Sequence, residues 1–113
     1  MKTVLYEQVA RIGKALSSPK RLEILELLMQ GEKSVEKLVA LMQIDLKLAS
    51  AHLRSLREAS LVETRREGKH IYYRLSSDDI VGLLVKVREV AEEHLIELRI
   101  ALEQMSGTPE HLS

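Results

Sequence analysis

The chain has 113 residues, 45% of them hydrophobic with no Phe or Trp, so we expect one domain with a core of aliphatic side chains. It contains no cysteine, which excludes disulfides and thiolate metal sites. It has neither an apolar run long enough to span a membrane nor a signal-peptide pattern, and these two features indicate a cytoplasmic protein. Its net charge is zero but uneven, with +2 over residues 1–44, +3 over residues 45–75 and −5 over residues 76–113.

Three helices are predicted in the first part of the chain. Apolar side chains recur at helical spacing over residues 4–16, 19–30 and 35–42. Ser18 precedes the second helix and Ser34 precedes the third, and each can cap the free N–H groups of a first turn. Pro19 suits the first position of the second helix, and Gly31 can supply the left-handed backbone that ends it.

A fourth helix and a hairpin follow. The helix is predicted over residues 46–59, with Asp45 as its cap. Two runs rich in β-formers, residues 62–66 and 70–75, are joined by Glu67-Gly68, where the glycine can adopt a positive φ. A helix followed at once by a charged hairpin is typical of a winged helix-turn-helix, whose helix enters the major groove while its wing reaches the flanking DNA.

A last helix is predicted from Ser77 to about residue 105. Its apolar residues follow steps of three and four, close to a heptad pattern, which favours pairing with a second copy of the chain. The alternative is a helix that packs only on its own domain. Residues 106–113 are expected to form a flexible tail, outside a domain of residues 1–105. The predicted dimer interface consists of Leu5, Val9 and Ile12 in the first helix and of Leu84, Val87, Ala91, Leu95, Leu98 and Leu102 in the last.

Three segments in this order resemble the ArsR (ArsR/SmtB) family of bacterial repressors. They are residues 16–25 (LSSPKRLEIL), residues 50–57 (SAHLRSLR) and residues 67–75 (EGKHIYYRL). The resemblance implies a mainly α-helical, homodimeric winged helix that binds a palindromic operator and is released by an inducer. Residues 5–16 also look like a subgroup that carries a rhodanese domain after this segment. The sequence stops before such a domain, so the chain is either a stand-alone regulator or part of a longer protein.

The fourth helix should turn Ala49, Leu53 and Leu56 inward, which leaves its other face for DNA. Arg54 can pair with guanine, and Lys47 can meet a phosphate or a base edge. The basic wing suits the negative minor groove, and an outward Tyr72 can bond a phosphate. The alternative for each basic residue is a solvated side chain. The expected DNA-binding residues are Lys47, Ser50, Ala51, Arg54, Ser55, Arg57, Arg65, Arg66, Lys69, His70 and Tyr72.

Leu46, Leu48 and Ala51 depart from the family pattern and bear on how strongly the fourth helix reads sequence. Ala51 stands where the family commonly has a longer polar residue. Leu46 and Leu48 stand where the family usually has small or polar residues, so toward DNA they can contact only thymine methyl groups or sugars. One of them can instead pack against the preceding helix. His52, between core leucines, is interpreted as a hydrogen-bonded packing residue rather than a ligand.

No metal or other cofactor is expected. The family's thiolate site needs cysteines, and its other site pairs Asp-x-His with His-x-x-Glu across the dimer. Only the second half is present, as His94 and Glu97, because Val81-Gly82-Leu83 stands where the first half belongs. The alternative is that His94 and Glu97 belong to a solvent-exposed acidic face of the helix.

A dimeric DNA-binding repressor is the leading hypothesis for function. The alternative is a winged-helix dimer that acts as a protein-interaction module, which Leu46, Leu48 and the zero net charge favour and the basic wing opposes. Neither a nucleophile constellation nor a glycine-rich phosphate loop is present, so an enzyme is not expected. The operator, the regulated genes and the inducer do not follow from the sequence.

Overall fold

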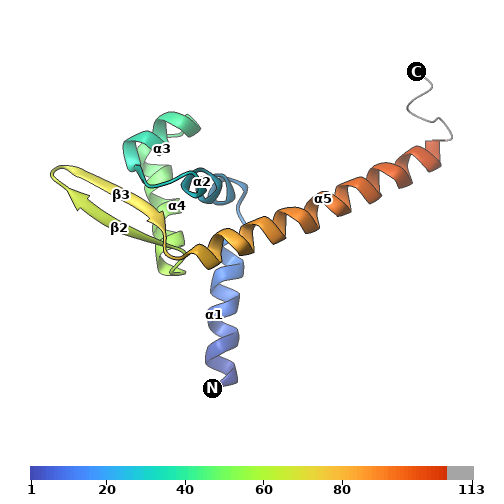
Figure 1. Cartoon of the computed structure of the whole chain (residues 1–113), viewed down its shortest axis with the longest axis horizontal. Coiled ribbons are helices and arrows are strands. Elements are labelled where there is room, and N and C mark those ends of the chain that lie inside the picture. The colour runs from blue at the N-terminus through green and yellow to red at the C-terminus, as the bar shows by residue number, and fades with distance from the viewer. Residues whose placement is uncertain (107–113) are drawn as a thin grey trace. The chain divides into compact units, whose positions relative to one another are not determined.

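The computed structural model describes residues 1–106, which form a mainly α-helical winged helix-turn-helix (Figure 1). The chain divides into two compact units, Met1–Val81 and Gly82–Ser113. The single domain over residues 1–105 therefore stays a prediction. The elements in chain order are α1 (Lys2–Ala15), α2 (Pro19–Met29), β1 (Lys33–Ser34), α3 (Val35–Met42), α4 (Leu46–Glu58), β2 (Val62–Glu67), β3 (His70–Leu75) and α5 (Asp78–Ser106).

Side-chain caps set the starts of the three central helices, as the sequence predicts. The Ser18 hydroxyl accepts a hydrogen bond from the Arg21 N–H at 3.3 Å, and Pro19 occupies the first position of α2. Ser34 caps α3, and the Asp45 carboxylate accepts from the Leu48 N–H at 2.6 Å at the start of α4. Each cap satisfies a backbone donor that the helix itself leaves unpaired.

The predicted bounds are close to those observed. Helix α1 begins two residues earlier than expected, and α1, α2 and α4 each end one residue earlier. Gly31 has the expected positive φ, at 136°, two residues after the end of α2. Gln43 turns the chain between α3 and α4 with a φ of 54°, a left-handed conformation that its residue type did not predict.

The core lies between α2, α3 and α4. Its fully buried large side chains are Ile24, Leu25, Leu38, Leu53 and Leu56. The residues Leu53 and Leu56 come from α4 and join Ala49 in the buried line that the sequence predicts. Burial of each of these aliphatic side chains contributes roughly 1.5–3 kcal/mol. It holds α4 against α2 and α3 and determines which face of α4 is exposed to solvent.

The hairpin forms the wing and gains one strand that the sequence did not predict. The strands β2 and β3 pair antiparallel, with Val62 opposite Leu75 and Glu67 opposite His70. The two-residue β1 adds to the other side of β3, which makes the order β1-β3-β2. A run of two residues, Lys33 and Ser34, has no pattern by which a strand is recognised. The hairpin projects beyond the helices of the first unit (Figure 1).

The turn of the hairpin lies one residue later than expected. Strand β2 extends through Glu67, so Gly68 and Lys69 form the two-residue connection. Gly68 has a φ of 61°, the positive value for which a glycine was expected at this turn.

Helix α5 is long and largely uncovered. Asp78 and Asp79 lie in its first turn, where carboxylates favour the positive end of the helix dipole. Ile80 is buried, but none of the described residues after it is. The helix includes Ser106, and the rest of the expected tail lies outside the described residues. Within residues 1–106, no helix is both long and apolar enough to cross a membrane.

Candidate DNA-binding surface

Two opposite lines of side chains run along α4. Ala49, Leu53 and Leu56 form the buried line. Lys47, Ala51 and Arg54 recur with the same spacing two positions away, and all three are exposed. Two positions along an α-helix turn the side chain by about 200°, so the second line faces away from the core. The α4 face that the sequence assigned to DNA is therefore open to solvent.

The basic side chains of α4 are unpaired. Among the described residues, Lys47, Arg54 and Arg57 make neither an ion pair nor a side-chain hydrogen bond, and all three are exposed. Ser50 is exposed on the flank of this face, and Ser55 is half-buried. Unpaired cations on an exposed helix are available to phosphates and base edges without first losing an internal partner.

Two leucines widen the α4 surface with apolar area. Leu46 is 59% exposed and Leu48 is 41% exposed, so neither is buried against α3. Leu41, near the end of α3, is also exposed. The turn between the two helices therefore presents aliphatic side chains next to the unpaired Lys47. The alternative expectation, that one of the two α4 leucines packs against the preceding helix, stays a prediction, and Leu48 is the less exposed of the two.

Arg21 ties the end of α1 to α2 and α4. Its guanidinium donates to the carbonyl oxygens of Ala15 at 2.7 Å and Lys14 at 3.0 Å, where α1 leaves carbonyls without helical partners. It also lies 3.5 Å from Nδ1 of the half-buried His52. Burial and the positive charge of Arg21 lower the pKa of His52, so its neutral form is favoured. This contact supports the interpretation of His52 as a packing residue.

The outer face of the wing carries charges that neutralise one another. Cross-strand register places Glu63 opposite Arg74 and Arg65 opposite Tyr72. The Arg74 guanidinium donates to the Glu63 carboxylate at 2.8 Å. At the tip, Nδ1 of His70 lies 3.5 Å from the Glu36 carboxylate of α3. These basic residues have acidic partners, which distinguishes the wing from α4.

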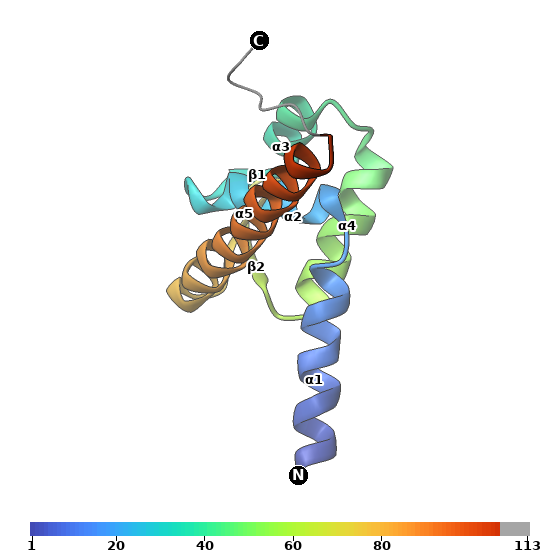
Figure 2. The same ribbon diagram turned by 90° about the vertical axis from the view of Figure 1, so that its right-hand side faces the viewer.

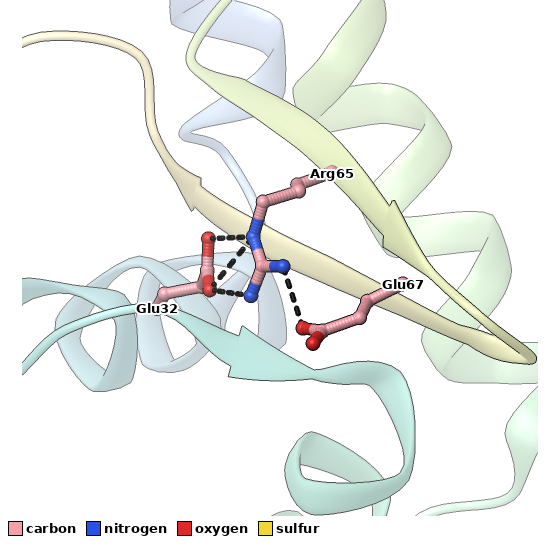
Figure 3. Close-up of polar contacts among 3 residues, drawn as sticks. All are labelled: Glu32, Arg65 and Glu67. Atoms are coloured by element: carbon pink, nitrogen blue, oxygen red, sulfur yellow. Dashed lines mark hydrogen bonds and ion pairs between the residues drawn. The ribbon is translucent and has the colours of Figure 1, made fainter.

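Arg65 is the most heavily bonded of these side chains (Figure 3). Its Nε lies 3.2 Å from both carboxylate oxygens of Glu32, and its Nη2 lies 2.5 Å from one of them. Its Nη1 donates to Glu67 at 2.7 Å. The guanidinium carbon sits 4.6 Å from the centre of the Tyr72 ring. The hydrogen bond from Arg65 lowers the pKa of the Glu32 carboxyl, and the carboxylates raise the pKa of Arg65.

Arg66 and Lys69 are the free cations of the wing. Both are exposed, and neither has an ion pair or side-chain hydrogen bond within residues 1–106. Arg66 lies one residue beyond Arg65, so its side chain leaves the opposite face of β2. Lys69 lies in the turn. Of the five wing residues expected to meet DNA, these two have no competing partner.

Sequence reasoning missed Glu32 and Arg21. Glu32 lies 33 positions from Arg65, and Arg21 lies 31 positions from His52. Neither spacing leaves a local pattern, because the contacts depend on how β1 and α4 are packed. The register of the hairpin, which is local, does predict that Arg65 and Tyr72 share a face.

The predicted interface residues of α1 and α5 lie mostly on open surface. Leu5 and Val9 are 58% and 57% exposed, and Ile12 is half-buried. In both views α1 extends away from α2, α3 and α4 (Figures 1 and 2). In α5, Leu84 is half-buried and the other expected interface residues are exposed, namely Val87, Ala91, Leu95, Leu98 and Leu102. In the single chain, each of these two helices therefore has a largely solvent-exposed stripe of apolar side chains.

Metal-ligating side chains do not cluster in the described part of the chain. Residues 1–106 contain no group of three or more His, Asp or Glu side chains placed to hold an ion. His94 and Glu97 are both exposed on α5. The absence of a metal stays a prediction, because a site shared between two copies would take ligands from both.

Comparison with known proteins agrees with the fold. Residues 18–64 match the model of the bacterial regulatory protein arsR family. The chain is 45% identical over 109 residues to the HTH-type transcriptional regulator Rv0324 of Mycobacterium tuberculosis, covering 96% of this chain and 48% of that protein. It is 44% identical over 77 residues to the biofilm growth-associated repressor of Agrobacterium fabrum, covering 68% and 66%. The chain thus spans about half the length of the first relative.

A solved structure provides the corresponding evidence in three dimensions. The homodimeric winged helix-turn-helix DNA-binding domain of Mb0332 from Mycobacterium bovis, a possible ArsR-family regulator, matches with a TM-score of 0.79 and 48% identity. The match covers 83% of this chain and 87% of that domain. This family consists of transcription regulators rather than enzymes. With its winged helix and these relatives, the chain belongs to the arsR family of bacterial DNA-binding regulatory proteins.

Proposed function

We propose that the chain is a dimeric transcriptional repressor that binds a palindromic operator through α4 and the wing. The observation that carries the proposal is the exposed line of Lys47, Ala51 and Arg54 opposite the buried leucines of α4. Such a line can enter a major groove while the core side of the helix holds its orientation. The repressor name of the Agrobacterium relative supports the direction of regulation.

The expected contacts divide between the two elements. Arg54 and Lys47 are the proposed contacts to base edges, and Ala51 lies between them. Ser50, Ser55 and Arg57 flank that line and are proposed to meet the phosphate backbone. In the wing, Arg66 and Lys69 are the proposed phosphate or minor-groove contacts, and His70 and Tyr72 stay candidates near the tip.

Dimerisation is proposed to cover the apolar stripes of α1 and α5. A helix of 29 residues is about 43 Å long, and in proteins most of the stability of a helix comes from packing of its apolar face. Leu95, Leu98 and Leu102 are 63%, 46% and 64% exposed, so a second α5 would bury substantial apolar area. The homodimeric state of the Mb0332 domain supports the same assembly. Two copies then present two α4 helices to the half-sites of a palindrome.

A gel shift on the protein's own promoter across a salt series tests the proposal. We expect one palindrome to bind more tightly than bulk DNA, with a steep salt dependence because basic side chains release counterions. If no palindrome exceeds bulk DNA at any salt, the repressor proposal is wrong. Transcription in vitro from the bound promoter then separates repression from activation, since a repressor lowers transcript yield.

An interaction module without specific DNA binding is the second candidate. The exposed Leu46 and Leu48 favour it, because apolar side chains on α4 suit a protein partner as well as a groove. Analytical ultracentrifugation combined with the same gel shift separates the two candidates. A dimer of twice 12.8 kDa without DNA affinity would support the interaction module.

The wider context is also a proposal. We expect a cytoplasmic regulator whose DNA affinity responds to an inducer, and a relationship to the subgroup with a rhodanese domain. The greater length of Rv0324 is compatible with a further segment in that relative. Reading the gene beyond the codon for Ser113 tests the last point directly, because a continuing frame would encode any such domain.

A further inference from the structure

We propose that Arg65 is a positioning residue that staples the wing to the segment before α3, and that it does not itself hold DNA. This inference rests on the proposed DNA-binding function. The staple consists of Arg65 on β2, Tyr72 on β3, and Glu32 immediately before β1. It differs from the prediction from the sequence, in which Arg65 and Arg66 both contact DNA.

The side chain of Arg65 crosses the whole sheet. The strand order β1-β3-β2 places β3 between Arg65 and the strand that Glu32 precedes. From β2 the guanidinium passes over the Tyr72 ring, at 4.6 Å from its centre, and reaches the Glu32 carboxylate with two nitrogens. One residue therefore contacts all three strands or their immediate extension.

This crossing matters because β1 is held by little else in the sheet. It contributes only Lys33 and Ser34, which pair with Tyr73 and Tyr72. An isolated surface ion pair contributes little to stability, but a bidentate arginine within a network is the favourable case. The Tyr72 ring adds a cation–π contact to the same guanidinium. Together these contacts are suited to fix the wing relative to the start of α3.

The same contacts make Arg65 a poor phosphate ligand. All three guanidinium nitrogens already donate to carboxylates, two to Glu32 and one to Glu67. Only one N–H of each terminal nitrogen remains, and a phosphate bound there would approach the carboxylates of Glu32 and Glu67. Arg66, on the opposite face of β2 and without a partner in the described chain, meets neither obstacle. The neighbouring arginines are therefore a matched pair for experiment.

Salt dependence of operator binding distinguishes a phosphate contact from a positioning residue. Each phosphate contact adds about one unit to the slope of log affinity against log salt. Arg66→Ala should reduce the slope by about one unit, whereas Arg65→Ala should leave the slope unchanged and lower affinity about two- to fivefold. A slope that falls by one unit in Arg65→Ala would overturn the proposal.

The sign of the Glu32 effect provides a second test. If Glu32 anchors the wing, Glu32→Gln weakens operator binding about two- to fivefold, in parallel with Arg65→Ala. If Glu32 instead withholds Arg65 from DNA, Glu32→Gln tightens binding, which would contradict the staple. Arg65→Lys should behave like Arg65→Ala, because lysine keeps the charge but loses the planar fork. Arg66→Lys, the matched control, should bind almost as the unchanged protein does.

A measurement without DNA separates failure of the staple from failure of the proposed function. Amide hydrogen exchange at β1 and β3 should accelerate in Arg65→Ala and Glu32→Gln, and should stay unchanged in Arg66→Ala. Equal exchange in all variants would overturn the staple even if the protein binds its operator. Faster exchange in a protein that binds no palindrome would support the staple and contradict the repressor proposal.

Discussion

Helix α4 and the wing differ in how their positive charge is made available. On α4, Lys47, Arg54 and Arg57 have no partner among the described residues. On the outer face of the wing, Arg65 and Arg74 are each paired with carboxylates. A count of basic residues treats the two elements alike, but Arg66 and Lys69 are the wing cations without an acidic partner among the described residues.

The difference has a geometric cause. Along α4, core packing takes every third or fourth residue and leaves Lys47 and Arg54 on the opposite side, where neither has a partner among the described residues. In a hairpin, each outward side chain faces another across the strands. The register sets Glu63 against Arg74, and the added β1 brings Glu32 to the same face as Arg65. Cross-strand register thus pairs charges on the wing, whereas Lys47, Arg54 and Arg57 of α4 have no partner among the described residues.

The largest expected effect comes from the buried line of α4. Leu53 is 0% exposed, so Leu53→Ala should lower the free energy of unfolding by about 2–5 kcal/mol through lost burial and the cavity that remains. Urea unfolding of the variant and of the unchanged protein measures this difference in the free energy of unfolding. Ser50→Ala, on the exposed flank, is the matched control and should change stability by less than about 0.5 kcal/mol. Equal losses would show that α4 does not have one buried and one free side.

Arg54→Ala tests whether the unpaired charge of α4 reads sequence. A bidentate contact to guanine is worth about 1–3 kcal/mol of discrimination, so operator affinity should fall roughly 5- to 150-fold while bulk DNA affinity changes much less. Fluorescence anisotropy with operator and scrambled duplexes measures both affinities. Arg57→Ala should weaken both duplexes alike. The assignment of roles is wrong if the two variants have the same effect.

Leu48→Ala tests the apolar part of the same surface. Its exposed side chain can contact thymine methyl groups, and each buried methyl contributes about 0.8 kcal/mol. Replacing operator thymines by deoxyuridine should therefore weaken the unchanged protein roughly fourfold per contacted methyl. The Leu48→Ala variant should be insensitive to the replacement. Sensitivity that persists in the variant would assign the methyl contact to another residue.

The smallest expected effect concerns pH and the Arg21–His52 contact. The folded protein lowers the pKa of His52 from its ordinary value of 6.5, so protons bind the unfolded chain more readily. The contribution of neutral His52 to the free energy of unfolding is fully present above about pH 6.5, and it is lost as the pH falls toward the lowered pKa. His52→Gln should reduce the loss of unfolding free energy between about pH 7.5 and about pH 5.5.

The amino-acid sequence by itself determined the helices, their caps and the buried line of α4. Ser18, Ser34 and Asp45 act on N–H groups three residues away, and the core leucines follow helical spacing, so this information is local. The sequence also identified the exposed face of α4, because that face is what core packing leaves. The roles of the individual DNA-facing residues stay predictions.

Only the tertiary structure decided which cations of the wing are free. The pairing of Arg65 with Glu32 spans 33 positions and depends on β1, a strand of two residues that has no signature in the sequence. The contact between Arg21 and His52 likewise forms only when α2 and α4 pack together. Such pairs are determined by where the folded backbone brings distant side chains, whereas a local pattern reports only on neighbours along one helix or strand.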